Sequence, residues 1–152
     1  MPRPEDQLYR DIVLDHARRP RNAGRLPQAE RSGSVVNPLC GDEMCVDLAF
    51  AGEKILEVRF LVRGCAIATA SASMLSEQLI GLTLDEVFEL ERRWQKVLDN
   101  TEAELPEQLE PLVPLLSVRK FPHRQNCARL AWEALRAARP NPQEAARHEG
   151  TY

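Results

Sequence analysis

The stretch "EMCVDLAFAGEKILEVRFLVRGC", residues 43–65, alternates between apolar and polar side chains over most of its length. A period of two residues indicates β-strands that bury one face. Residues 51–54 form a short glycine-containing turn between the two halves, so the stretch predicts an antiparallel β-hairpin. The predicted apolar face carries Met44, Val46, Leu48 and Phe50 in the first half, and Leu56, Val58, Phe60 and Val62 in the second.

The segments around the hairpin predict helices and one more strand. A small antiparallel three-stranded sheet with helices packed on one face follows, because the apolar face of the hairpin must be covered. The fold class is therefore α+β. We expect helices over residues 4–19, 66–81, 83–98 and 122–138, a short strand over 34–37, a loop over 20–33, and only short helical turns in the proline-broken segment 101–116.

Length and composition indicate one folded domain. The chain has 152 residues, of which 43% are hydrophobic and 28% charged, and we assign residues 1–138 to a single domain and 139–152 to a loosely ordered tail. A net charge of −3 provides no general attraction for nucleic acid. No apolar run is long enough to span a membrane, and the charged N-terminal segment does not resemble a secretion signal. We therefore expect a cytoplasmic protein without a nucleic-acid or membrane partner.

Three of the four cysteines belong to three separate segments of the predicted fold. Cys40 precedes a strand, Cys65 begins a helix, and Cys127 lies in the last helix. Gly41 has the backbone freedom to turn Cys40 and Asp42 toward one centre, and a helix N-terminus favours the thiolate of Cys65. Three sulfurs and one carboxylate suit a tetrahedral zinc site and also suit iron. Spacing alone leaves the alternative of unrelated thiols open.

Several further residues compete for a place at such a site. Cys45 lies on the polar face of the hairpin with Asp47, so it is predicted to point away from the site. His16, at the end of the first helix, is predicted to cap that helix or lie at the edge of the core. Basic residues at the metal end would stabilise its negative charge, and a solvated surface is the equal alternative. These residues are Arg18, Arg19, Arg21, Arg63, Arg119, Lys120 and Arg124.

Four segments together carry a resemblance to a known family. "YRDIVLDHARRPRNAG", "NPLCGDEMCVDLAF", "VRGCAIATASASML" and "RQNCARLAWEAL" resemble the iron–sulfur cluster assembly family that comprises SufU, IscU and the N-terminal module of NifU. The resemblance extends over about residues 8–136. It implies that the metal or cluster ligands are Cys40, Asp42, Cys65 and Cys127.

The resemblance is closer to the SufU branch. IscU-type proteins have a histidine directly before the third cysteine and an LPPVK segment, whereas this chain has Asn126 and "LLSVRKFPHRQNC". The segment between Cys65 and Cys127 is longer than in IscU, which is similar to SufU. Arg124 also matches the SufU pattern. Asn126 differs from both branches, since SufU usually has lysine there.

The SufU branch implies a zinc-dependent sulfur acceptor rather than an enzyme in the strict sense. In that function Cys40 accepts sulfur from a cysteine desulfurase and supports delivery to recipient apo-proteins or downstream Suf machinery. The first alternative is an IscU-type scaffold that holds iron or a transient [2Fe–2S] cluster. The second, from another class, is a domain whose zinc is purely structural, which a buried site with complete hydrogen bonding would favour.

Overall fold

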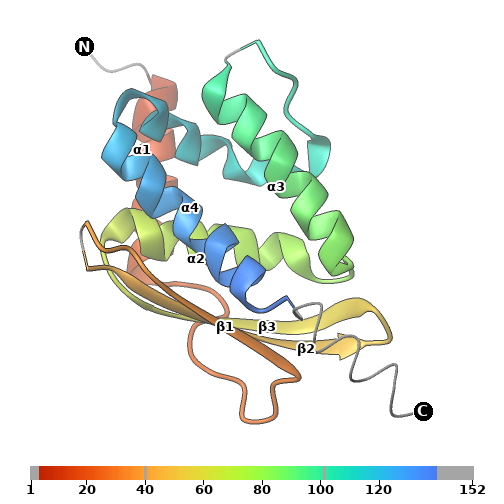
Figure 1. Cartoon of the computed structure of the whole chain (residues 1–152). Coiled ribbons are helices and arrows are strands. Elements are labelled where there is room, and N and C mark those ends of the chain that lie inside the picture. The colour runs from red at the N-terminus through yellow and green to blue at the C-terminus, as the bar shows by residue number, and fades with distance from the viewer. Residues whose placement is uncertain (1–3, 40, 101, 140–152) are drawn as a thin grey trace.

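The computed structural model describes residues 4–39, 41–100 and 102–139. A three-stranded antiparallel sheet in the order β1-β2-β3 forms one layer, and the helices cover one of its faces (Figure 1). The predicted α+β class is therefore confirmed. Most of the predicted tail, residues 140–152, lies outside the described residues. The elements are α1 Pro4–Arg18, β1 Arg31–Val36, β2 Glu43–Ala51, β3 Lys54–Arg63, α2 Ala66–Leu79, α3 Leu84–Asp99, the 3-10 helix η1 Glu107–Lys120 and α4 Pro122–Ala137.

The hairpin forms as predicted, with one difference in its apolar face. Leu56 is 55% exposed and Ile55 is buried in its place. The register between β2 and β3 shifts here, because Ala49 pairs with Glu57 whereas Phe50 pairs with Ile55. Leu56 is thus the extra residue of a β-bulge, which turns the next side chains to the opposite faces. The prediction that Leu56 lies on the buried face was wrong for this reason.

Strand β1 begins three residues earlier than predicted, at Arg31. Glycine disfavours strands, and the sequence therefore predicts that Gly33 lies in the loop. In the structure α4 packs directly on this position. A Cβ atom at Gly33 would lie 2.3 Å from the carbonyl oxygen of Ala134 and 2.4 Å from the amide nitrogen of Ala138. Only a residue without a side chain lets the backbones of β1 and α4 approach this closely.

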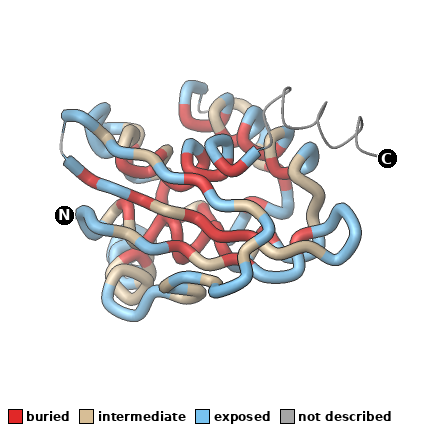
Figure 2. The backbone as a smooth tube through the Cα atoms, turned by 60° about the horizontal axis from the view of Figure 1, so that its bottom comes forward, coloured by how far each residue is buried: buried red, intermediate tan, exposed pale blue. Residues whose placement is uncertain are grey.

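Helix α2 lies at the centre of the helical layer. It contacts β3 on one side and α1, α4 and η1 on others, and most of its residues belong to the buried core (Figure 2). Its alanines and serines are small enough to allow these close approaches. The hydroxyl of Ser71, for example, donates a hydrogen bond of 2.8 Å to the carbonyl of Ala128 in α4.

The proline-broken segment forms a longer helix than predicted. Residues 107–120 are one 3-10 helix that contains Pro111 and Pro114. A 3-10 helix has three residues per turn, so side chains three positions apart lie on one face. Four buried apolar residues follow this spacing, and they are Leu109, Leu112, Leu115 and Val118. Burial of that stripe stabilises a conformation that propensity alone disfavours.

The loop before β1 covers part of the outer face of the sheet, opposite the helices (Figure 1). Its anchor is Asp47 of β2, which is 1% exposed. The Asp47 carboxylate accepts hydrogen bonds from the Arg25 guanidinium at 2.6 Å, the Leu26 amide at 2.9 Å and the Ser32 hydroxyl at 2.6 Å. Burial opposes ionisation, but these donors outweigh it and hold the pKa of Asp47 below its ordinary value.

His16 lies at the edge of the core, as the sequence predicted. Its Nδ1 atom is 2.7 Å from the Ser73 hydroxyl, which also accepts a hydrogen bond of 2.8 Å from the Arg21 amide. Its Nε2 atom is 4.0 Å from a carboxylate oxygen of Glu77. The imidazole therefore connects α1, the following loop and α2.

Acidification is expected to destabilise the fold through His16. Burial, reinforced by the Arg21 charge, lowers the pKa of His16 in the folded protein. The unfolded chain then binds more protons, so the free energy of unfolding falls as pH drops below about 6.5, the ordinary histidine pKa. Urea unfolding between neutral and mildly acidic pH measures this slope. The slope should decrease in His16→Gln and persist in His123→Gln, which alters an exposed residue; equal slopes in all three proteins would contradict the assignment.

Candidate metal centre

The loop that leads into β2 is held by its own hydrogen bonds. The Asn37 side-chain oxygen accepts from the Leu39 amide at 3.0 Å, and the Asn37 carbonyl accepts from the Gly41 amide at 2.7 Å. Gly41 has φ +76°, a left-handed conformation that favours glycine, as predicted. The Asn37 amide donates to the Asp42 carbonyl at 2.8 Å, which places Asp42 at the end of the sheet. Cys40, between Leu39 and Gly41 in the chain, lies outside the described residues.

Cys65 is the N-cap residue of α2, so its position at a helix N-terminus is confirmed. Its Sγ atom accepts a hydrogen bond of 3.4 Å from the Ala68 amide. Its own amide donates to Oδ2 of Asp42 at 3.3 Å. Amide donors and the positive end of the helix dipole both stabilise negative charge, which suits Cys65 as a metal ligand.

Cys127 approaches the same place from α4. The potential ligand atoms of Asp42, Cys65 and Cys127 all lie within 4.8 Å of one another. Asp42 and Cys127 are buried, whereas Cys65 is exposed. Two sulfurs on one tetrahedral zinc ion lie about 3.8 Å apart, as follows from Zn–S bonds of about 2.3 Å. The three donors therefore fit zinc with small movements, and one side of the site is open to solvent.

Gly64 leaves the room that Asp42 occupies. A Cβ atom at Gly64 would lie 2.8 Å from Cγ of Asp42. We expect Gly64→Ala to weaken zinc binding by about tenfold, the lower end of the effects seen when groups that orient metal ligands are changed. Competition with a chromogenic chelator measures this affinity. Urea unfolding of the metal-free variant separates displacement of Asp42 from general destabilisation. An unchanged zinc affinity would show that the Asp42 side chain moves aside without losing its place in the zinc site.

Residues outside this cluster have other contacts. Cys45 lies on the outer side of the sheet, where its Sγ atom is 3.1 Å from the Ser34 hydroxyl, so it points away from the cluster as predicted. Arg21 pairs with Asp15 at 2.7 Å. The charge of Arg21 is thus paired within its own segment.

Two more of the basic residues have contacts of their own. Arg119 donates to the carbonyl of Val97 at the end of α3. Arg124 lies over the ring of Phe121, 4.7 Å from its centroid, in the first turn of α4. Arg124 thus remains within one helical turn of Cys127, whereas the Arg119 side chain is hydrogen-bonded to α3.

Two residues that shape the site, Asn37 and Gly64, were not predicted from the sequence. The Asn-Pro dipeptide at 37–38 was an available signal, because asparagine side chains often accept from the backbone two residues on and so begin turns. Gly64 carried no such signal. The contact that requires a glycine there involves Asp42, which is distant in sequence.

No helix in the described part of the chain is both long and apolar enough to cross a membrane.

Comparison with known proteins agrees with this arrangement. The family model described as the NifU-like N-terminal domain matches residues 8–144. The iron–sulfur cluster assembly scaffold protein IscU of Streptococcus pyogenes serotype M1 is 35% identical over 133 residues, which cover 88% of this chain and 83% of the relative. The zinc-dependent sulfurtransferase SufU of Bacillus subtilis (strain 168) is 32% identical over 134 residues, covering 86% and 88%.

A solved structure shows the same fold. FiSufU from the thermophile Fervidobacterium islandicum AW-1 superposes with a TM-score of 0.76 at 30% identity, covering 84% of this chain and 93% of that one. The three-stranded sheet with its helical layer is thus the fold of this relative as well. From the family match over most of its length, the chain belongs to the NifU-like N-terminal domain family.

Proposed function

We propose that this protein serves iron–sulfur cluster assembly by binding zinc through Cys40, Asp42, Cys65 and Cys127 and accepting sulfur from a cysteine desulfurase on Cys40. The observation that carries the proposal is the convergence of three potential ligand atoms within 4.8 Å. Cys40 belongs to the same short loop as Asp42. Its thiol would complete a set of three sulfurs and one carboxylate, which suits zinc.

Two further observations support sulfur acceptance over a purely structural zinc site. Cys65 is exposed, whereas a structural site is normally closed. The Bacillus subtilis relative is named a zinc-dependent sulfurtransferase. Asn126 and the missing LPPVK segment set the chain apart from the IscU pattern.

The proposed step is a thiol–persulfide exchange at Cys40. When bound, zinc would keep the ligand thiols deprotonated at neutral pH. The Cys40 thiolate attacks the outer sulfur of the persulfide on the desulfurase. The sulfur–sulfur bond of the donor breaks as a new one forms at Cys40, and the donor cysteine leaves as a thiolate. The proton stays on the transferred sulfur, so the exchange needs no oxidant or reductant.

The test is alanine production by the cognate cysteine desulfurase, with and without the zinc-loaded protein. We expect stimulation over many turnovers that disappears in Cys40→Ala. Cys45→Ala is the matched control, because it removes a thiol on the outer side of the sheet and should leave the stimulation intact. Absence of stimulation by a protein with confirmed bound zinc would overturn sulfur acceptance.

A scaffold for a nascent cluster is the second candidate. The observation in its favour is the carboxylate of Asp42 beside Cys65 and Cys127, because a carboxylate binds soft metals more weakly than thiolate does and would ease release. Reconstitution with iron and sulfide tests it. A stable cluster absorbance that passes to an apo-ferredoxin would support the scaffold function, and a protein that forms no cluster would exclude it.

A further inference from the structure

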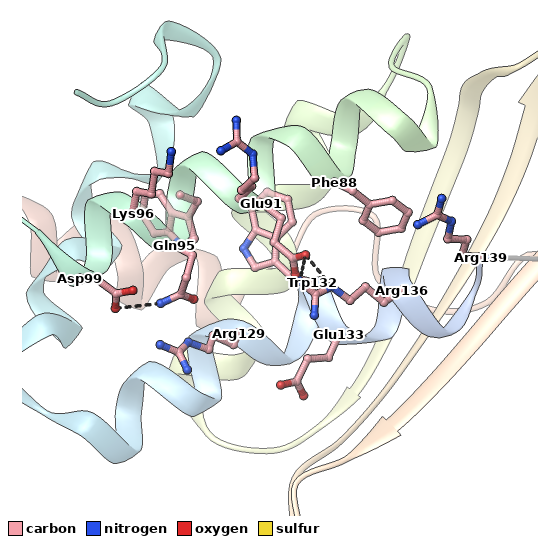
Figure 3. Close-up of a pocket in the computed structure, with 12 residues that line it drawn as sticks. Phe88, Glu91, Gln95, Lys96, Asp99, Arg129, Trp132, Glu133, Arg136 and Arg139 are labelled. Carbon is pink, nitrogen blue, oxygen red and sulfur yellow. Dashed lines mark hydrogen bonds and ion pairs between the residues drawn. The ribbon is translucent and has the colours of Figure 1, made fainter. Parts of the chain in front are cut away.

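A groove with a volume of about 980 Å³ lies between α3 and α4 (Figure 3). Trp94 and Trp132 line it and are themselves buried, at 1% and 2% exposure. Sites for small molecules typically have volumes of about 300–1,000 Å³. The groove therefore has the size of a ligand site, with aromatic side chains among a largely charged lining.

The groove is separate from the candidate metal centre. Arg129 lines it, two residues after Cys127 in α4. Successive residues of an α-helix are about 100° apart around the axis, so these two side chains leave α4 in nearly opposite directions. Cys127 faces the cluster with Asp42 and Cys65, and Arg129 faces α3.

Basic side chains outnumber acidic ones in the groove lining. Arg136 is engaged across the groove, where its Nε atom donates to Glu91 at 2.6 Å. Lys96 and Arg129 have no ion pair of this kind among the described residues. The acidic residues of the lining, in addition to Glu91, are Asp99 and Glu133, and the basic ones, in addition to Arg136, are Arg92, Lys96, Arg129 and Arg139.

The Arg129 side chain is incompletely satisfied. Its Nε atom is buried, and within the part of the chain that the structure describes it has no hydrogen-bond partner. A guanidinium is always charged at neutral pH, and a buried donor without an acceptor is costly. Figure 3 shows this side chain at one end of the groove, below Gln95 and Asp99. The same guanidinium carries four further N–H donors in a planar arrangement that suits an oxyanion in the groove.

We propose that this groove binds a small organic anion. Its carboxylate or phosphate group accepts hydrogen bonds from Arg129, and its body lies along the groove beside Trp132. Asp99 and Glu133 in the same lining disfavour long polyanions such as nucleic acid, which restricts the ligand to one compact anionic group. This site goes beyond the proposed sulfur acceptance and requires no metal.

The two tryptophans provide a direct signal for the test. They are the only tryptophans in the sequence, and both line the groove. Tryptophan emission is followed while AMP, as a phosphate ester, or succinate, as a carboxylate, is added at constant ionic strength. A saturable change with AMP alone identifies a phosphate ester, a change with succinate alone identifies a carboxylate, and a change with both identifies a general oxyanion site.

Substitutions test whether the anion binds in the groove. Arg129→Gln should weaken it by at least about tenfold, since a charged hydrogen bond is lost. Arg93→Gln removes an exposed arginine of α3 outside the groove and should leave the affinity unchanged. Lys96→Gln provides a second variant if circular dichroism shows that Arg129→Gln is unfolded. The absence of a saturable change with either probe, or equal affinities in the wild type and a folded groove variant, would overturn the proposal.

Discussion

Replacing Cys127 with serine is expected to weaken zinc binding by about 100-fold or more. Structural zinc sites bind with about 10–16 kcal/mol in total, so one of four ligands contributes about 3 kcal/mol, and each 1.4 kcal/mol is a factor of ten. Cys127 is buried beside Asp42 and Cys65, where a serine hydroxyl is a much poorer ligand than a thiolate. Competition with a chromogenic chelator, together with the zinc content of the purified protein, measures the loss.

Cys45→Ser is the matched control for this experiment. The substitution makes the same chemical change on the outer side of the sheet, where Cys45 contacts Ser34. Zinc affinity should then remain that of the wild type. If Cys127→Ser retained full affinity, or if Cys45→Ser lost as much as Cys127→Ser, the assignment of Cys127 to the metal centre would be wrong.

The second large effect is expected from Gly33→Ala, which should lower the free energy of unfolding by about 3 kcal/mol, the upper end for overpacked sites. The new Cβ atom would lie 2.3 Å from the carbonyl oxygen of Ala134 and 2.4 Å from the amide nitrogen of Ala138. Both atoms belong to the backbone at the end of α4, so they cannot move away as a flexible side chain can. Urea unfolding of the metal-free protein measures the change.

Gly52→Ala separates crowding from backbone conformation. Gly52, in the turn of the hairpin, has φ +65° and no atom within 4 Å of the added Cβ. Its substitution should cost only about 1–2 kcal/mol, the price of a left-handed conformation for a residue with a side chain. A Gly33→Ala variant that is as stable as Gly52→Ala would show that α4 shifts away from β1 at little cost.

Local sequence patterns predicted much of the fold correctly. The alternation of the hairpin and its short turn required only neighbouring residues. The capping box of Thr83 and Glu86 at the start of α3 is equally local. Cys65 at the N-terminus of α2 was predictable for the same reason. The physical cause is that turns, caps and periodicity are set by interactions within a few residues along the chain.

Other features depended on contacts between distant segments. The β-bulge that exposes Leu56 is a property of the pairing between two strands. The 3-10 helix over residues 107–120 is stabilised by its buried stripe despite two prolines. Asp47 is buried only because Arg25 and Leu26 from the preceding loop reach its carboxylate. Intrinsic propensity disfavours or does not predict each of these three features. They are set by tertiary packing.

The sequence by itself determined the residue types of the candidate centre, the hairpin that precedes Cys65 and the family to which the chain belongs, because these are carried by short motifs. Only the tertiary structure decided that Asp42, Cys65 and Cys127 meet within 4.8 Å, that Gly64 leaves room for Asp42, and that α3 and α4 form a groove lined by an arginine whose Nε atom is buried. Each of these requires segments far apart in the chain to be brought together, which happens only when the helical layer packs on the sheet.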